Sequence, residues 1–361
     1  MRVAIVHYWF VGMRGGEKVV EAILDIYPDA DIYCHVCDNS QISKKISSRI
    51  KGTTFISRMP WATKLYRNYL TLMPIALEQL DLTEYDLVIS SESGPAKGII
   101  ISPDATHICY CHSPMRYVWD MYHQYRNRAS LLKRIVMPAV MHYLRMWDVS
   151  SSHRVTHFIA NSKYVAQRIN KYYCRGATVI NPPVNFGDFE VSEEQADYYL
   201  IVGQLVDYKK ADIAIEAFNQ NGRKLVVIGE GELLGYCRRI AKPNITLLGS
   251  QPASVLKEHY AKCRALIFPG IEDFGIVPLE AMASGRPVIA YAKGGALDTV
   301  IEGKTGLFFN KQSPEAITSA ILHFEDTAQT FDSKVILEHA RSFDTKQFIA
   351  RLSEFINSVQ E

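Results

Sequence analysis

Residues 269–280 read Pro269-Gly270-Ile271-Glu272-Asp273-Phe274-Gly275-Ile276-Val277-Pro278-Leu279-Glu280. They follow an apolar run, 265–268, typical of a buried strand, and precede residues 281–285, typical of a helix that ends at a glycine. Gly275 lets the backbone approach a ligand closely, and the first N–H groups of the helix direct its positive dipole end there. The stretch predicts a site for an anionic ligand with hydroxyl groups, with amides for phosphate and Glu272 and Glu280 for hydroxyls. An ordinary loop with incidental acids is the alternative.

Composition bounds the class of protein. The 361 residues suffice for two domains, and 48% hydrophobic with 22% charged residues is typical of a globular chain. The sequence contains neither a run of about 18 apolar residues nor a signal-peptide pattern, so we expect a cytoplasmic protein. The net charge of +2 is too small to indicate nucleic acid. The seven cysteines are expected to be reduced thiols, and their spacing completes no four-ligand metal set.

Strand-like and helix-like segments alternate in both halves of the chain, which predicts two α/β domains with parallel sheets. Strands are expected near residues 2–7, 31–36, 86–91, 106–112 and 157–160, and then near 198–202, 224–228, 245–248, 265–268, 288–291 and 306–309. A polar stretch, residues 186–197, separates the halves and is the predicted linker; its acids are Asp188, Glu190, Glu193, Glu194 and Asp197.

Polar residues of the first half gather where ligands bind to open parallel sheets, beyond the carboxyl ends of strands. The set comprises His7, Gly15, Gly16, Ser91, Glu92, Ser93 and His112. The glycine turn does not match G-x-G-x-x-G, so a dinucleotide fingerprint is not predicted. Arg116 lies among aromatic residues and could contact phosphate or stack. A turn without a ligand and a structurally hydrogen-bonded histidine remain the alternatives.

Residues 126–147 combine cations with apolar side chains in an amphipathic pattern. Such a segment could lie on an anionic membrane, and residues 56–72 are a second candidate. The alternative is a core-facing helix with a solvated basic face. Pro138 is expected to break or kink the helix.

Taken together, these motifs resemble the retaining glycosyltransferase family 4 (glycosyl transferases group 1), of the GT-B fold. The second half carries residues 203–209, Gly229-Glu230-Gly231, the E-x7-E element from Glu272 to Glu280, and Gly294-Gly295. The first half carries Gly15-Gly16, residues 91–94, residues 112–117 and Asn161-Ser162. The resemblance covers nearly the whole chain. Residues 12–18 and 112–117 look most like bacterial O-antigen mannosyltransferases of the WbaZ type.

The resemblance implies an α/β protein of two Rossmann-like domains that face each other across a cleft. Residues 1–185 would bind the acceptor, and residues 198–342 would bind a nucleotide-sugar donor. Residues 343–361 would form a helix that packs back on the N-terminal domain. Domain closure about residues 181–197 would exclude water.

The resemblance also assigns roles to donor-site residues. Glu280 would bind the ribose hydroxyls, and Glu272 would bind the sugar. Lys209 would neutralise the pyrophosphate. Backbone groups contribute through Phe274, Gly275, Ile276, Val277, Gly249 and Gln251.

Position 204 departs from the family pattern, which usually has arginine there. Gln204 offers hydrogen-bond donors but no charge. Lys210 or Arg116 could compensate.

On the first half, the resemblance lets His112 contact the sugar or stabilise positive charge at its anomeric carbon. His112, Glu272 and Lys209 are thus the expected catalytic residues, and Gly15, Gly16, Ser91 and Arg116 the expected acceptor or phosphate loop.

The implied activity is retaining transfer of mannose from GDP-mannose to a lipid-linked or polysaccharide acceptor, in O-antigen synthesis at the inner face of the cytoplasmic membrane. The leaving phosphate would take the acceptor's proton, without a carboxylate nucleophile, a metal or another cofactor. A UDP- or dTDP-sugar transferase, a nucleotide-sugar epimerase or dinucleotide oxidoreductase, and a non-catalytic nucleotide-sugar binder are the alternatives.

Overall fold

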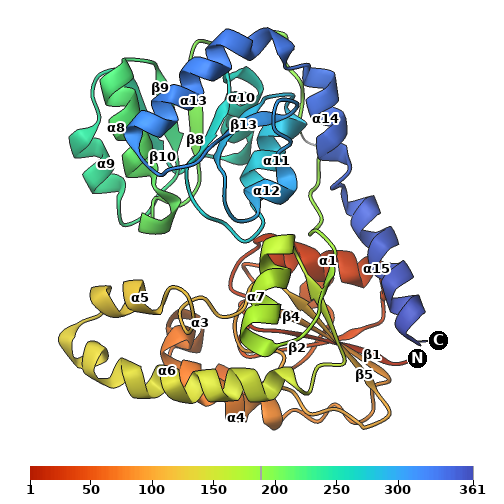
Figure 1. Cartoon of the computed structure of the whole chain (residues 1–361). Helices are drawn as coiled ribbons and strands as arrows, with labels where there is room; N and C mark the ends of the chain where they lie inside the picture. The colour runs from red at the N-terminus through yellow and green to blue at the C-terminus, as the bar shows by residue number, and fades with distance from the viewer. Residues whose placement is uncertain (188, 361) are drawn as a thin grey trace. The chain divides into compact units, whose positions relative to one another are not determined.

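The computed structural model describes residues 1–187 and 189–360; Asp188 of the predicted linker and Glu361 lie outside the described residues. The chain forms two compact units. The first comprises Met1–Pro183 and Phe348–Glu361, and the second comprises Val184–Gln347 (Figure 1). Each unit is an α/β layer structure built on one sheet.

The sheet of the first unit has, among the described residues, seven parallel strands in the order β3-β2-β1-β4-β5-β6-β7. The strands are β1 (Val3–His7), β2 (Asp31–Cys34), β3 (Ile50–Thr53), β4 (Leu87–Glu92), β5 (Thr106–Cys111), β6 (His157–Ala160) and β7 (Thr178–Val179). The direction of winding reverses between β1 and β4. At this reversal His7 is paired in register with Ser91.

Helices cover both faces of this sheet because alternate strand residues point to opposite sides. Ile5 belongs to the core cluster that includes α1 (Gly15–Ile26), whereas Ala4 and Val6 belong to the cluster that includes α4 (Met73–Glu78) and α6 (Leu131–Ser152). The other helical segments of this unit are α2 (Lys44–Ser47), η1 (Phe55–Arg58), α3 (Ala62–Leu65), η2 (Tyr66–Leu72), α5 (Tyr122–Arg128) and α7 (Lys163–Tyr173).

Helix α15 (Thr345–Gln360) returns the chain to the first unit. Its buried residues Phe348, Leu352 and Ile356 recur every four positions and therefore share one helical face. That face packs into the same core cluster as Ile5 and α1. The first unit is thus completed by a segment distant in sequence.

The sheet of the second unit has six described parallel strands in the order β10-β9-β8-β11-β12-β13. They are β8 (Tyr199–Val202), β9 (Leu225–Ile228), β10 (Ile245–Gly249), β11 (Leu266–Phe268), β12 (Val288–Tyr291) and β13 (Gly306–Phe309). Here the direction of winding reverses between β8 and β11. In open sheets of this kind such a reversal is where ligands bind.

The helices of the second unit also lie on both faces of its sheet. One cluster joins Tyr199 and Ile267 to α8 (Ala211–Asn221) and α13 (Pro314–Thr327), and the other joins Leu200 and Leu266 to α11 (Ile276–Ala283) and α14 (Ser333–Arg341). The remaining segments are η3 (Asp207–Lys209), α9 (Leu234–Ile240), α10 (Ala253–Lys262), α12 (Ala296–Thr299) and η4 (Ala328–Thr330). The prediction of two Rossmann-like α/β domains is confirmed.

Several local details differ from the expectations. Helix α1 begins at Gly15, so Gly15 and Gly16 of the expected turn lie in the first helical turn. Helix α6 continues through Pro138, so the helix does not break there, and a kink at Pro138 stays a prediction. Val184 and Phe186, near the predicted linker, are buried in a core cluster of the second unit, so the unit boundary falls at Pro183.

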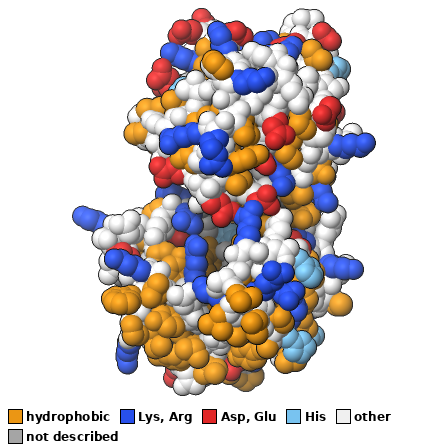
Figure 2. Space-filling model, turned by 90° about the vertical axis from the view of Figure 1, so that its left-hand side faces the viewer, with side chains coloured by type: hydrophobic (Ala, Val, Ile, Leu, Met, Phe, Trp, Pro, Cys, Tyr) orange, Lys and Arg blue, Asp and Glu red, His pale blue; other side chains and the backbone are white. Residues whose placement is uncertain are grey.

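The start of α6 is exposed on all sides. Each residue from 131 to 136 is solvent-accessible, whereas Met141 and Leu144 farther along the helix are buried. Figure 2 looks onto the side from which α5 and α6 project in Figure 1, and it shows hydrophobic, Lys and Arg side chains gathered over the first unit.

Candidate active-site residues

A pocket lies at the carboxyl ends of β8 and β11, where the second sheet reverses its winding. Its lining combines apolar strand ends with polar groups from two loops: Ile201, Val202, Gly203, Gln204, Leu205, Lys209, Ala211, Ile267, Phe268, Pro269, Gly270 and Glu272. Three of the predicted donor-site residues, Gln204, Lys209 and Glu272, therefore share one pocket.

Lys209 and Glu272 form an ion pair across this pocket. Lys209 Nζ lies 2.7 Å from Glu272 Oε1, and both side chains are about one-fifth exposed. The cation is held by η3 and the carboxylate by the loop after β11. A phosphate group bound here would interact with Lys209 while Lys209 remains paired with Glu272. The pocket thus offers a cation for phosphate beside a carboxylate that can accept hydrogen bonds from hydroxyl groups.

The loops around the pocket pack backbone against backbone. Gly295 donates its N–H to the carbonyl of Glu272 at 2.9 Å. A Cβ at position 295 would lie 2.3 Å from the backbone of Phe274, which only glycine avoids. The Gly294-Gly295 pair thus fixes the path of the loop that carries Glu272.

Helix α11 begins at this loop. Gly275, its N-cap residue, has φ +89°, a left-handed conformation that side-chain-bearing residues rarely adopt. The N–H groups of Ile276 and Val277 open the helix and lie in the region where the dipole favours an anion.

Glu280 lies one turn farther along α11. Its Oε2 accepts a hydrogen bond from the hydroxyl of Tyr260 at 2.7 Å. Burial raises the pKa of the Glu280 carboxyl, while the Tyr260 hydrogen bond and the charge of Lys209 oppose that rise. The Tyr260 contact holds the carboxyl in one orientation and was not foreseen, because nothing in the sequence links the two residues.

The remaining predicted donor residues occupy the edge of the same sheet. Gln204 is exposed in the loop after β8. Lys210 caps α8, and its Nζ donates to Asp207 Oδ1 at 3.2 Å. Gly249 ends β10 and accepts from the N–H of Gly229 at 2.8 Å, and Gln251 Nε2 donates to the Leu248 carbonyl at 2.7 Å.

In the first unit, Ser91 joins two histidines at the carboxyl edge of the sheet. Ser91 Oγ lies 3.0 Å from His7 Nδ1 and 2.8 Å from His112 Nε2. Ser91 and His7 are fully buried, and His112 is partly exposed. One hydroxyl therefore orients both rings, and only His112 reaches the surface.

The backbone of His112 is also fixed. Its N–H donates to the Glu92 carbonyl at 2.7 Å, and its carbonyl accepts from Asn161 Nδ2 at 2.9 Å. A Cβ on Gly16, in the first turn of α1, would lie 3.6 Å from His112 Nε2. The glycine thus brings the start of α1 against the histidine, as the sequence pattern had placed them.

The surroundings of His7 are electrostatically unusual. Burial, and to a lesser extent His112, lowers the pKa of His7 well below its ordinary value, so its ring is neutral at pH 7. Glu17 Oε1 lies 4.0 Å from His7 Nε2, and burial raises the pKa of this carboxyl. Glu17 Oε2 also accepts from the Arg14 N–H at 2.9 Å and so caps α1.

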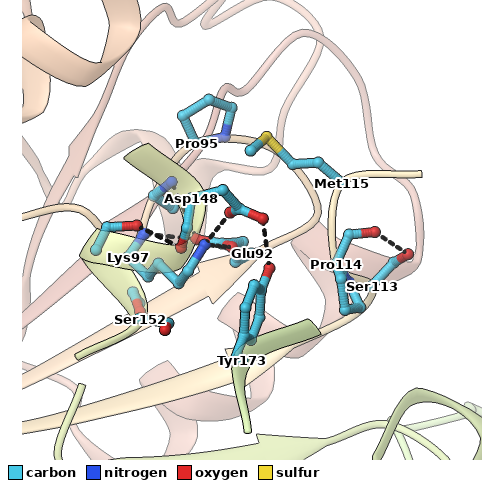
Figure 3. Close-up of polar contacts among 12 residues, drawn as sticks. Glu92, Pro95, Lys97, Ser113, Pro114, Met115, Asp148, Ser152 and Tyr173 are labelled. Carbon is cyan, nitrogen blue, oxygen red and sulfur yellow. Dashed lines mark hydrogen bonds and ion pairs between the residues drawn. The ribbon is translucent and has the colours of Figure 1, made fainter. Parts of the chain in front are cut away.

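Glu92 ends β4, as expected, but its side chain is fully buried. The chain turns it inward, where Glu92 Oε1 binds Lys97 Nζ at 2.8 Å and Lys97 also binds Asp148 of α6 (Figure 3). All three side chains are fully buried. Asp148 Oδ2 accepts further bonds from Tyr173 and Trp119, at 2.9 and 2.7 Å.

This buried ion cluster was missed at the sequence level. The sequence gives only a weak indication of this cluster. Lys97 is flanked by apolar residues and glycine, and Asp148 is the one acidic residue in the sequence of α6. Such a cluster is costly to break, because the group left behind is buried and charged. It therefore fixes the loop after β4, which carries Ser93 and Gly94, to α6.

The two other predicted loop residues are placed as follows. Gly15 opens α1 beside Gly16, and Arg116 is partly buried in the loop after β5. Among residues 1–187 and 189–360, no three His, Cys, Asp or Glu side chains gather as metal ligands would. Within the same ranges, no helix combines the length and apolar character that a membrane span requires.

Two family models match the chain. The model described as Glycosyltransferase Family 4 matches residues 13–187, and the model described as Glycosyl transferases group 1 matches residues 188–334. The two matches meet close to the boundary between the units.

Proteins of similar sequence carry glycosyltransferase names. An uncharacterized glycosyltransferase of Methanocaldococcus jannaschii is 31% identical over 52% of this chain and 54% of its own length. The O-antigen chain mannosyltransferase RfbU of Salmonella typhimurium is 28% identical over 51% of this chain and 55% of its own. The alpha-1,3/1,6-mannosyltransferase alg2 of Schizosaccharomyces pombe is 22% identical over 96% and 78%. The first two matches thus span only about half of each relative.

A solved structure extends the likeness to the whole fold. Anabaena HepE, crystallised in complex with UDP, superimposes with a TM-score of 0.70 at 16% identity, over 99% of this chain and 100% of its own. With two parallel-sheet units of this topology and both family matches, the chain belongs to the glycosyltransferases of the GT-B fold.

Proposed function

We propose that this protein is a retaining family 4 glycosyltransferase that moves mannose from GDP-mannose onto a lipid-linked or polysaccharide acceptor in bacterial O-antigen synthesis. The observation that carries the proposal is the pocket at the β8–β11 reversal, with the paired Lys209 and Glu272. The mannosyltransferase names of two relatives support the choice of sugar.

The donor would be held by complementary charge and hydrogen bonding. Lys209 and the first N–H groups of α11 face the nucleoside diphosphate, whose charge grows as the sugar leaves. Glu272, which is paired with Lys209, accepts hydrogen bonds from hydroxyl groups of the sugar. Glu280, oriented by Tyr260, accepts from the ribose.

The transfer step breaks the bond between the anomeric carbon and the phosphate oxygen. The acceptor hydroxyl attacks that carbon from the same face, and its proton passes to the departing phosphate oxygen. His112, fixed by Ser91 and Asn161, stabilises the positive charge of the sugar. No carboxylate nucleophile and no metal ion are needed, so turnover should persist in excess EDTA.

The test is nucleoside diphosphate release from GDP-mannose, UDP-glucose, UDP-N-acetylglucosamine and dTDP-rhamnose, with and without an acceptor extract. We expect selective turnover of GDP-mannose. Lys209→Ala and Glu272→Ala should each reduce it about 100-fold or more, because each removes a group that faces the reacting donor. Lys311→Ala, at an exposed lysine of the same unit, is the matched control.

The other outcomes discriminate clearly. Near-normal turnover by Lys209→Ala would refute the site. Selective turnover of a UDP- or dTDP-sugar would replace the donor and retain the enzyme class. Tight binding of one nucleoside diphosphate without turnover under any acceptor would indicate a non-catalytic binder. In that case Gln204→Arg would show whether the missing cation is the cause.

A further inference from the structure

We propose that the projecting α5–α6 tip, residues 122–136, docks the protein on an anionic lipid bilayer. The inference rests on the proposed function in one respect: a lipid-linked acceptor would be reached from such a surface.

The tip exposes aliphatic side chains that a water-soluble surface rarely presents together. Leu131, Leu132 and Ile135 are 77%, 74% and 69% exposed, and Val136 is also exposed. They occupy the first turns of α6, where every side of the helix is accessible. Large apolar side chains exposed close together in this way indicate an interaction site.

The charge around the patch has one sign. Residues 121–147 contain no Asp or Glu and five cations, Arg126, Arg128, Lys133, Arg134 and Arg145, in a chain whose net charge is only +2. Lys133 and Arg134 lie directly between the exposed leucines and Ile135. Apolar side chains mixed with cations match the interface of an anionic bilayer, where the former enter the acyl boundary and the latter meet phosphates.

Residues 39–77, which pack beside α6, also lack acidic side chains and expose an aromatic one. Leu70 and Leu77 from this segment share a core cluster with Met137 and Met141 of α6. Trp61, also in this segment, is 76% exposed. Trp is enriched at membrane–water interfaces, because one part of its ring is apolar and another donates a hydrogen bond.

The second half of α6, which follows the tip in sequence, is packed against the rest of the first unit. Farther along α6, Leu144 and Trp147 are buried in the first unit, and Asp148 is held in the buried ion cluster of Figure 3. Arg145 Nε donates to the Val118 carbonyl at 2.8 Å, and its guanidinium lies 4.7 Å from the ring centre of Tyr122 in α5. The second half of α6 is therefore held to the first unit, while the first turns of α6 stay exposed.

The experiment is co-sedimentation of the full chain with vesicles of phosphatidylcholine alone and of phosphatidylcholine with phosphatidylglycerol. We expect binding to the anionic vesicles that weakens as salt rises. Lys133→Glu/Arg134→Glu and, separately, Leu131→Ser/Ile135→Ser should each reduce the bound fraction at least about tenfold.

Each variant has a matched control on the second unit. Lys304→Glu/Lys311→Glu makes the same charge change at exposed lysines, and Leu322→Ser/Val335→Ser makes the same kind of apolar change at exposed side chains. Both controls should bind vesicles like the unchanged chain. Circular dichroism confirms that each variant is folded.

Absence of binding to anionic vesicles, or equal losses in the controls, would overturn the proposal. So would sedimentation without vesicles that Leu131→Ser/Ile135→Ser abolishes, because the patch would then join copies of the chain. Donor hydrolysis without acceptor, measured on the same variants, should stay unchanged. If the unchanged chain turns over none of the donors, either with or without acceptor extract, the proposed function is refuted and the docking result still stands.

Discussion

At the scale of single residues, the carboxyl ends of the strands carry different polar groups in the two units. The second unit places a cation and a carboxylate in direct contact, Lys209 with Glu272. The first unit instead places a chain of hydrogen bonds, His7–Ser91–His112, beside α1. A charged pair suits a phosphorylated ligand, whereas hydrogen bonds to one shared hydroxyl suit the orientation of a ring.

Ser91→Ala tests the second arrangement. Removal of the shared hydroxyl takes away a hydrogen bond that orients the His112 ring, so we expect kcat for transfer to fall about tenfold and the donor KM to stay within about twofold. Ser91→Thr, which keeps the hydroxyl, should restore most of the rate. The pH profile of kcat is measured on all three proteins.

A purely structural role for Ser91 would give a different pattern. Stability would fall in Ser91→Ala without a change in the shape of the pH profile, and kcat measured on the folded fraction would remain normal. That result would remove His7 and Ser91 from the positioning of His112.

At the scale of elements, the glycine motifs act by bringing loops into contact. Gly295→Ala would place a Cβ 2.3 Å from the Phe274 backbone, so the loop with Glu272 must move. We expect donor turnover to fall more than about tenfold, with a loss of about 1–3 kcal/mol in the stability of the second unit. Turnover assays and urea titrations measure the two effects.

Gly235→Ala is the control for that change. Gly235 lies in α9, and a Cβ there meets nothing within 4 Å. The substitution should leave turnover unaltered, since alanine is favoured in helices. If Gly295→Ala is equally harmless, the close packing of these loops does not matter for the site.

The return of α15 to the first unit gives a second prediction at this scale. Leu352→Ala removes a fully buried side chain from the core that contains Ile5 and α1, and should cost about 2–5 kcal/mol. Arg351→Ala, at an exposed neighbouring position, should cost little. Urea unfolding followed by hydrogen exchange should locate the loss in the first unit; a loss confined to the second unit would contradict the packing.

How far the sequence predicts these elements depends on how local their causes are. Most strands follow from short apolar runs, and the loop between Glu272 and Glu280 follows from its glycine and helix start, so these were predictable. The short strands β3 and β7 were not predicted, because neither is a clear apolar run. The course of α6 through Pro138 was not, because packing of its second half outweighs the local preference of proline. Neither Tyr260 beside Glu280 nor Lys97 beside Asp148 leaves a local pattern, because both contacts join distant segments.

At the scale of the whole molecule, buried neutral histidines make stability depend on pH. Burial lowers the pKa of His35 to about 4, and its ring is hydrogen-bonded to Thr54 Oγ1 and the Pro95 carbonyl. The unfolded chain, with a pKa near 6.5, binds more protons between about pH 4 and 6.5. The contribution of His35 is therefore full above pH 6.5 and falls with decreasing pH, by about 2 kcal/mol at pH 5.

The comparison of the unchanged chain with His35→Asn isolates this contribution. Other buried groups, such as Glu17 and Glu280, have raised pKa values and act in the opposite direction, but they are common to both proteins. Urea midpoints at pH 7.5, 6.0 and 5.0 should converge as the pH falls. Parallel midpoints would mean that His35 is not held neutral.

The division of the first unit between residues 1–183 and 348–361 has a consequence for synthesis. A ribosome makes the whole second unit before the segment that completes the first core. Until then, the apolar groove that receives Phe348, Leu352 and Ile356 stays open in the nascent chain. The unit encoded later can thus finish folding earlier, and the earlier one depends on the synthesis of residues 348–361.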